Sequence, residues 1–285
     1  MVSTVLFVMT ISIIIPCYNA GKTLQKCLDS ALNQGQKPYE VICVDDASTD
    51  NTPELLRSYG TRIKVITHTV NQGLGITRSD GIKAASGDYL YFLDSDDWIE
   101  PYTLESLVEA LDDADIVTGG IDSTPLSGIE AQKEYESSTT TFLCNRLIKK
   151  SLLDKEPMSD LRYFEDLDIM PRLLYRAKKV AFAKKTGYHY EPNENSLTTN
   201  ATETKHLVYK VLVTVNMCLY FAEHQPDWVM GLDLPGKIIA GLWALYMVAR
   251  QNPDEFNKFD TETDMILRRL TTLLVQAQKQ DKEQN

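Results

Sequence analysis

Residues 11–44 read ISIIIPCYNAGKTLQKCLDSALNQGQKPYEVICV and contain a complete strand-helix-strand pattern. Ile11–Ile15 is rich in β-branched isoleucine and is bounded by Pro16, which predicts a buried first strand. The apolar residues that follow repeat at helical spacing and predict a helix: Leu24, Cys27, Leu28, Ala31 and Leu32. Val41–Val44 is the next apolar run, so this stretch predicts two strands joined by a helix.

The same alternation continues to about residue 117. A helix is predicted to start at Thr52-Pro53, and strands are predicted at Ile63–Ile66 and Tyr89–Leu93. A further helix starts at Pro101, and Ile116-Val117 forms the next strand. Strands separated by helices predict an α/β fold, with a mostly parallel central sheet whose two faces are covered by helices.

Composition and charge limit the class of protein. The chain has 285 residues, of which 43% are hydrophobic and 24% charged, so fibrous and wholly disordered classes are excluded. The 29 Lys and Arg against 40 Asp and Glu give a net charge of −11, and we expect no nucleic-acid partner because phosphate binding needs a basic face. The five cysteines include no CxxC pair, which predicts a reducing compartment rather than a disulfide framework or a zinc cluster.

The beginning of the chain is apolar but is not typical of a secretory signal. It lacks a basic n-region, and its apolar run ends in Pro16 rather than in a small-residue cleavage site. We therefore expect a cytoplasmic protein. We also expect Met9 to be the true start, because residues 1–8 add nothing to the first strand; N-terminal sequencing tests this. Ile238–Ala249 is shorter than the roughly 20 residues of a membrane span, so membrane contact would be peripheral, at the inner face.

Acidic side chains follow two predicted strands at the points where these strands end. Asp45-Asp46 follows the second strand, and Asp94–Asp97 follows the Tyr89–Leu93 strand. In open α/β sheets ligands bind outside the carboxyl ends of the strands. Carboxylates crowded at one edge repel each other unless a cation compensates. Oxygen ligands at Asp94 and Asp96 suit Mg²⁺ or Mn²⁺, which substrate phosphates usually complete.

Local structural alternatives stay open for these segments. Asp94–Asp97 also suits an acidic turn before a helix, and an EF-hand is excluded because Ile99 stands where that loop requires glycine. Asp45–Asp50 also suits a turn and a helix N-cap. Asn71–Gly75 followed by Arg78 does not satisfy GxGxxG, so dinucleotide binding is disfavoured.

Taken together, these segments resemble the ordered motifs of bacterial family-two glycosyltransferases of GT-A fold. The motifs that carry the resemblance are Ile13–Asn19, Asp45–Asp50, Asn71-Gln72-Gly73 with Arg78, Gly87-Asp88-Tyr89 running into Phe92–Asp97, and Glu165-Asp166. The resemblance is closest over residues 10–115 and extends to about residue 200. Several motifs in the same order are highly specific for a family.

The resemblance implies an inverting enzyme that transfers a sugar from a nucleotide donor, usually a UDP-sugar. The residues implied to bind the nucleotide sugar are Pro16, Tyr18, Asn19, Asp46, Arg78, Asp94 and Ser95. Within this set, Tyr18 would lie against the base ring, Asp46 would accept a hydrogen bond from its imide, and Arg78 would help to hold the base.

The resemblance also implies a metal site and a general base. Asp96, together with Asp94, would bind the Mg²⁺ or Mn²⁺ that bridges the diphosphate, and Asp166 would be the base. Displacing a nucleoside diphosphate requires stabilisation of its developing charge and removal of a proton from the incoming hydroxyl. Metal and carboxylate supply these two effects. Asp166 also suits a helix N-cap.

One segment departs from the family pattern. Many relatives carry Tyr-x-Tyr-Arg after the base, whereas this chain has Tyr188-His189-Tyr190-Glu191, with glutamate in place of the cation. His189 could contact the metal or a phosphate, and it could equally pack among the tyrosines. Both interpretations stay open.

The predicted organisation is a catalytic domain over residues 1–200 and a helical extension over residues 201–285. The nucleotide half covers about residues 10–118 and the acceptor half about 119–200. The polar stretch at 120–141 is expected to select the acceptor, a saccharide or a lipid-linked saccharide. The extension would pack on the catalytic domain, form a homodimer or touch a membrane surface.

Two other functions stay open. The chain could be a catalytically silent subunit that binds sugar nucleotides or assists assembly. It could also be a nucleotidyltransferase on a similar sheet. That class needs a glycine-rich phosphate loop with a lysine near the first strand, and Asn19–Lys22 is too sparse to supply one.

Overall fold

The computed structural model describes residues 9–119, 142–185, 187–191, 203–224, 234–251, 254, 257–259 and 261–272. The chain divides into two compact units, Met1–Asn193 and Glu194–Asn285, and each is described by itself. The predicted acceptor-selecting stretch at 120–141 and residues 1–8 lie outside the described residues.

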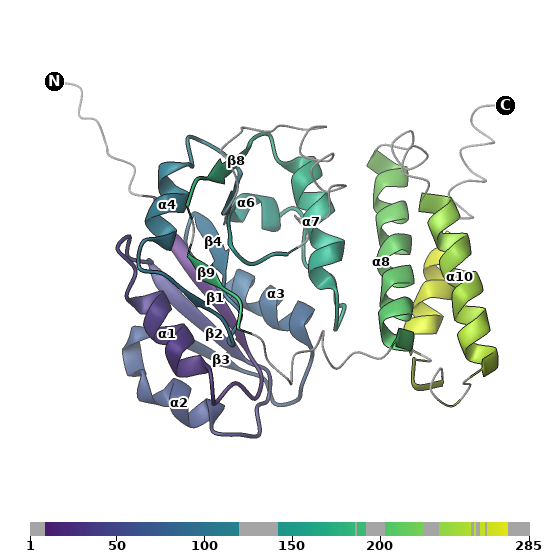
Figure 1. The fold of residues 1–285 in the computed structure, drawn as a ribbon, viewed down its shortest axis with the longest axis horizontal. Coiled ribbons are helices and arrows are strands. Elements are labelled where there is room, and N and C mark those ends of the chain that lie inside the picture. The colour runs from purple at the N-terminus through teal and green to yellow at the C-terminus, as the bar shows by residue number, and fades with distance from the viewer. Residues whose placement is uncertain are drawn as a thin grey trace. The chain divides into compact units, whose positions relative to one another are not determined.

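The first unit is built around a mixed sheet with the strand order β3-β2-β1-β4-β7-β6-β8 (Figure 1). These strands are β1 (Ile11–Cys17), β2 (Glu40–Asp45), β3 (Lys64–Thr67), β4 (Tyr89–Phe92), β6 (Ile116–Gly119), β7 (Arg146–Lys149) and β8 (Val180–Ala183). Strand β7 runs antiparallel to β4 and β6, and the other pairings are parallel, so the predicted mostly parallel sheet is confirmed. A small antiparallel pair joins β5 (Trp98–Ile99) to β9 (Tyr188–His189).

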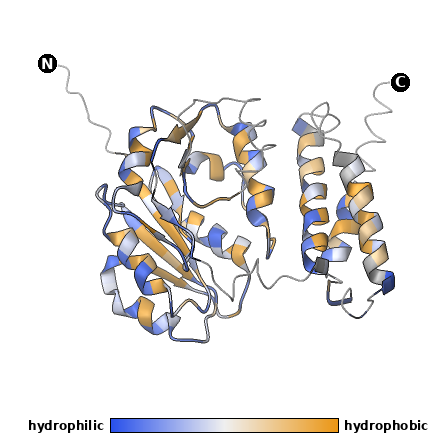
Figure 2. Cartoon of the chain, in the orientation of Figure 1, coloured by the Kyte–Doolittle hydropathy of each residue, from blue (hydrophilic) through white to orange (hydrophobic). Residues whose placement is uncertain are grey.

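Helices cover both faces of this sheet. They are α1 (Leu24–Leu32), α2 (Thr52–Ser58), α3 (Leu74–Ala84), α4 (Thr103–Glu109), α6 (Lys150–Leu153) and α7 (Glu165–Arg176), with a 3₁₀ turn η1 (Gly60–Arg62). Ile13 and Ile15 of β1 pack with Leu24 and Leu28 of α1 on one face. Ile14, between them, packs on the other face in the cluster that includes α3 and α7. Figure 2 shows the hydrophobic residues concentrated on the strands and on one side of the helices. The isoleucine run of β1 is thus explained by burial on both faces.

Strand β1 is longer than the sequence predicts. It extends through Cys17, so Pro16 is a buried strand residue paired with Val44 of β2 and is not part of the following turn. The ladder between β1 and β4 ends where Leu93 N donates to Ile14 O. Pro16 is the next residue of β1 that faces the β4 side. No backbone donor is needed there once the ladder has ended, so proline, which has no N–H, is tolerated.

The second unit is helical where it is described. It contains α8 (Glu203–His224), α10 (Leu234–Gln251), a short 3₁₀ turn η2 (Asn257–Phe259) and a helical segment at 261–272. Val208, Leu212 and Phe221 of α8 are buried, and α8 packs against α10. No helix among the described residues has the length and apolar character needed to cross a membrane.

Candidate active site

Strands β2, β1 and β4 lie side by side and parallel, so the segments that follow them meet at one edge of the sheet. The chain leaves β1 to build β2 and β3 on one side and then returns to place β4 on the other side. Ligands bind at such topological switch points, in the crevice at the carboxyl ends of the strands. The predicted site residues after β1, β2 and β4 therefore lie together at this edge, the candidate crevice.

The turn after β1 is tied to the turn after β2. Asn19 has a left-handed backbone with φ of 50°, its N–H donates to Ser48 Oγ at 2.9 Å, and its Oδ1 accepts from Thr49 N at 2.8 Å. Tyr18, one residue earlier, is 50% exposed. Asn19 is thus used to shape the turn, whereas the ring of Tyr18 is open to a ligand.

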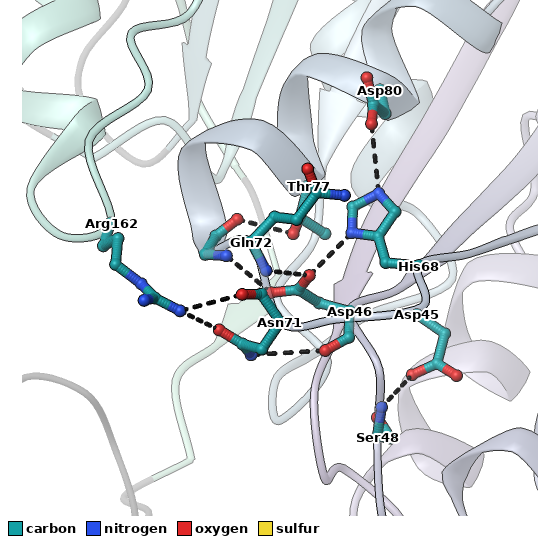
Figure 3. Close-up of polar contacts among 10 residues, drawn as sticks. Asp45, Asp46, Ser48, His68, Asn71, Gln72, Thr77, Asp80 and Arg162 are labelled. Atoms are coloured by element: carbon teal, nitrogen blue, oxygen red, sulfur yellow. Dashed lines mark hydrogen bonds and ion pairs between the residues drawn. The ribbon is translucent and has the colours of Figure 1, made fainter.

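Asp46 is buried, and its carboxylate accepts hydrogen bonds from within the protein (Figure 3). Its Oδ1 accepts from Gln72 N at 2.8 Å and lies 2.7 Å from His68 Nδ1, and its Oδ2 accepts from Gly73 N at 2.8 Å. In this structure the Asp46 carboxylate holds the 71–73 loop in place. Its predicted hydrogen bond to a nucleobase stays a prediction.

Residues 71–75, at the start of α3, lie directly against residues 159–162, which precede α7. Arg162 donates to Asn71 O at 3.1 Å and to the Asn71 side chain (Figure 3). A Cβ on Gly75 would stand 2.5 Å from Ser159 O, so only glycine fits this close approach. The start of α3 is therefore in direct contact with the segment before α7.

Arg78 of α3 is buried between two carboxylates from different elements. Its Nη2 donates to Asp94 Oδ1 at 2.6 Å, and its Nη1 donates to Glu165 Oε1. Burial lowers the pKa of the guanidinium, but the charges of Asp94 and Glu165 outweigh this and hold its pKa above the ordinary value. Within the protein the guanidinium of Arg78 binds these two acids, and its predicted contact with a nucleobase stays a prediction.

Glu165 and Asp166 open helix α7 after Phe164, which has a left-handed φ of 58°. Glu165 is buried, and burial raises its pKa to about 8, although the charge of Arg78 opposes the rise. Asp166 is half-buried, and its Oδ1 accepts from Leu167 N at 2.8 Å. Burial raises the pKa of Asp166, and Arg78 again opposes the rise. Asp166 is therefore a carboxylate whose proton affinity is increased beside a fixed cation, which suits a general base.

The segment after β4 contains one acid whose role sequence reasoning missed. Asp97 is buried and accepts hydrogen bonds from the Tyr188 hydroxyl and from Glu191 N, the latter at 3.0 Å. Burial raises its pKa to about 6. Asp94 is 32% exposed at its side chain, and Ser95 and Asp96 are half-buried. Asp97 thus anchors residues 188–191, while the acids before it border the crevice.

His189 makes other contacts than the predicted metal contact. Its ring stacks on Trp98 with centroids 3.6 Å apart, and its Nε2 lies 3.1 Å from Glu100 Oε1. Glu191, which stands where relatives carry arginine, accepts from Lys26 Nζ at 2.6 Å and from Trp98 Nε1 at 2.7 Å. Packing is therefore the interpretation that the surroundings of His189 support.

The family model for glycosyl transferase family 2 matches residues 12–168. The chain belongs to this family. The chain is 32% identical over 214 residues to EpsH of Bacillus subtilis, which is named as a putative glycosyltransferase. The match covers 66% of this chain and 62% of that relative. It is also 32% identical over 203 residues to the poly(ribitol-phosphate) beta-glucosyltransferase of Bacillus spizizenii, covering 64% of the chain and 32% of the relative. The chain thus spans less than two thirds of the length of either relative.

Among solved structures, the family 2 chain is similar to S. aureus TarS 1–349 in complex with UDP-GlcNAc. The TM-score is 0.68 at 20% identity, and the match covers 94% of this chain and 81% of that one. At this identity the likeness shows the fold, and it confirms the predicted GT-A architecture.

Asp94 and Asp96 suit a metal ion whose remaining ligands come from the diphosphate of a bound substrate. Within the described ranges, no group of three or more His, Cys, Asp or Glu side chains could hold a metal by itself. Asp94 and Asp96 offer carboxylate oxygens beside the crevice. Mg²⁺ is usually bound by one or two carboxylates together with waters and substrate phosphates, so this donor set suits a metal–diphosphate pair.

Proposed function

We propose that this protein is an inverting glycosyltransferase that moves a sugar from a UDP-sugar to a hydroxyl of a saccharide or lipid-linked saccharide, in the synthesis of cell-envelope glycans. The observation that carries the proposal is the position of Arg78. Its guanidinium bonds Asp94 after β4 and Glu165, the residue that precedes Asp166 at the start of α7. A donor-binding acid and a candidate base thus face one site.

In the proposed reaction, Asp166 removes the proton from the acceptor hydroxyl. The hydroxyl oxygen then forms a bond to the anomeric carbon as the bond from that carbon to the diphosphate oxygen breaks, and the nucleoside diphosphate leaves with the electron pair. A base opposite the leaving group gives in-line attack and inversion. The half-exposed ring of Tyr18 would stack on the nucleobase of the donor.

The developing charge on the leaving diphosphate needs a counter-charge. Asp94 and Asp96 would hold Mg²⁺ or Mn²⁺, which supplies that charge when bound. The proton transfer from the acceptor hydroxyl to Asp166 does not require the metal.

The relatives support the choice of donor and product class. TarS, similar in fold, has been solved with UDP-GlcNAc, and the relative from Bacillus spizizenii is named for glucosyl transfer to poly(ribitol phosphate). The first of these supports a UDP-sugar donor, and the second supports a polymer acceptor. The cytoplasmic location, the contact with the inner membrane face and the homodimer stay predictions.

A donor panel tests the proposal. The full chain is incubated with UDP-glucose, UDP-GlcNAc or UDP-galactose in Mn²⁺, in Mg²⁺ and in EDTA, and release of UDP is measured. We expect release with at least one donor, supported by metal. Asp166→Asn should bind the same donor and reduce turnover by about 10²–10⁴-fold.

Each other outcome has a defined meaning. Donor binding without UDP release under any condition would support the silent subunit. Near-full turnover in Asp166→Asn would rule out Asp166 as the base. Release of pyrophosphate from a nucleoside triphosphate would instead support a nucleotidyltransferase.

A further inference from the structure

Arg78 joins the segment after β4 to the start of α7 through side-chain charges. Its Nη2 binds Asp94 and its Nη1 binds Glu165, which precedes Asp166 in the chain. We propose that Arg78 and Glu165 form a positioning pair that fixes Asp166 opposite the donor-binding Asp94. This inference rests on the proposed function, because it assigns the placement of the base in that reaction.

The backbone around the pair is already held on both sides. Asp46 accepts from Gln72 N and Gly73 N, which fixes the chain at the start of α3. Residues 159–162 contact the same loop at Gly75 and Asn71, three residues before α7 begins. The bond from Arg78 of α3 to Glu165 of α7 can therefore transmit a fixed position to Asp166, the next residue.

The choice of residue types favours positioning over stability. The side chains of Arg78 and Glu165 are 4% and 1% exposed. Buried ion pairs seldom stabilise a fold more than apolar residues of the same size, because both charges lose their hydration. Arginine, however, presents several donors in a rigid fork, which allows one side chain to orient two carboxylates at once. A lysine ammonium cannot reproduce this geometry.

The charges around the Arg78–Glu165 pair also support a positioning role. Asp94, Glu165 and Asp166 all act on the guanidinium, and Cys144 also faces it. Burial raises the pKa of the Cys144 thiol to about 12, so this group stays neutral. Arg78 is the cation that lowers the pKa of Asp166 against the effect of burial. Without it, Asp166 would hold its proton at a higher pH and would be displaced from its position.

The main test compares Arg78→Met with the full-length wild type. The pKa of Asp166 is followed by ¹³C NMR of its side-chain carboxyl, and kcat and KM are measured with the UDP-sugar that gives the highest rate. We expect the pKa of Asp166 to rise, the acid limb of kcat to move to higher pH, and kcat to fall by roughly 10²-fold, as for a misplaced catalytic group. Arg78→Lys should restore the pKa but only part of kcat.

A second variant separates loss of positioning from loss of the fold. Arg78→Met leaves Glu165 buried without its partner, so Arg78→Met/Glu165→Gln removes both charges together. This double variant should melt close to the wild type and keep the low kcat. Glu165→Gln alone keeps the bond between Arg78 and Asp94, so its donor KM should stay within about twofold while kcat falls roughly tenfold.

The matched control lies two turns further along the same helix. Arg172 of α7 binds Asp168 at 2.6 Å, has a side chain only 13% exposed and donates to Pro157 O. Arg172→Met should lower the melting temperature and leave the pKa of Asp166 and the pH profile unchanged. An unchanged pKa and kcat in folded Arg78→Met would overturn the inference. A wild-type protein that releases no UDP from any donor would instead contradict the proposed function.

Discussion

At the scale of single residues, the carboxylate of Asp46 shows how a motif acid can serve the backbone. It accepts from two consecutive backbone N–H groups and lies 2.7 Å from His68, which in turn lies 3.2 Å from Asp80. An acid with these partners fixes a loop. The family motif therefore specifies the shape of the crevice at this position, and the open contact surface comes from neighbours such as Tyr18.

Asp46→Asn should lower the free energy of unfolding markedly, although the two side chains are nearly the same size. An amide has one acceptor oxygen, so it cannot accept from Gln72 N and Gly73 N and also from His68, and a buried donor is left without a partner. We expect a loss of about 1–3 kcal/mol in the free energy of unfolding, measured in urea. Asp154→Asn is the matched control, because its exposed pair with Lys150 is worth about 0.3–0.5 kcal/mol. Equal losses in the two variants would contradict this role of Asp46.

The pH dependence of turnover follows from Asp166. Burial raises its pKa, and Arg78 only partly offsets the rise. A base must be ionised, so kcat/KM should be lost as the pH falls, with an apparent pKa above the ordinary value of about 3.9. UDP release measured from pH 4 to 8 checks this. The residual activity of Asp166→Asn should lack this acid limb; if the limb persists, another group titrates.

At the scale of elements, residues 71–75 at the start of α3 pack on residues 159–162, which precede α7. Gly75 makes this possible, because a Cβ there would stand 2.5 Å from Ser159 O and 2.6 Å from Leu161 O. Both obstacles are backbone atoms, which cannot turn aside as a flexible side chain can. The position of α7 relative to α3 therefore depends on the absence of one methyl group.

Gly75→Ala should separate these segments and reduce both stability and turnover. Overpacking of this kind costs about 1–3 kcal/mol. Turnover should fall as well, because Asp166 moves with α7. Gly35→Ala is the control, since its Cβ would meet Pro101 O at 3.4 Å, an ordinary contact. Thermal unfolding and UDP release measure the two effects. A Gly75→Ala protein as stable and active as Gly35→Ala would contradict the close packing.

The same contact marks the limit of prediction from sequence. The alternation of apolar runs predicted the sheet and its helices, and the ends of the strands predicted where Tyr18, Asp46 and Asp94 gather. The partners of Arg78 could not be predicted, because Glu165 lies 87 residues away and no local pattern records which segments meet. Asp97 was missed for the same reason, since its donors come from Tyr188 and Glu191.

At the scale of the whole molecule, each of the two units buries apolar residues of its own among those described. The two apolar clusters of the sheet unit contain residues between Ile11 and Ala183, whereas Val208, Leu212 and Phe221 are buried in the helical unit. Every residue of the proposed site, from Tyr18 to Asp166, belongs to Met1–Asn193. The sheet unit therefore holds its own core and all the side chains of the proposed nucleotide site.

A chain that ends at Asn193 should therefore fold and bind UDP. We expect a dissociation constant for UDP with Mn²⁺ within about threefold of the full chain, a difference below 1 kcal/mol, because no site residue is removed. Calorimetry measures the binding, and circular dichroism checks the fold. Asp96→Ala in the same shortened chain should weaken binding in Mn²⁺ and serves as the control for a specific site. A shortened chain that folds but does not bind UDP would show that the helical unit completes the nucleotide site.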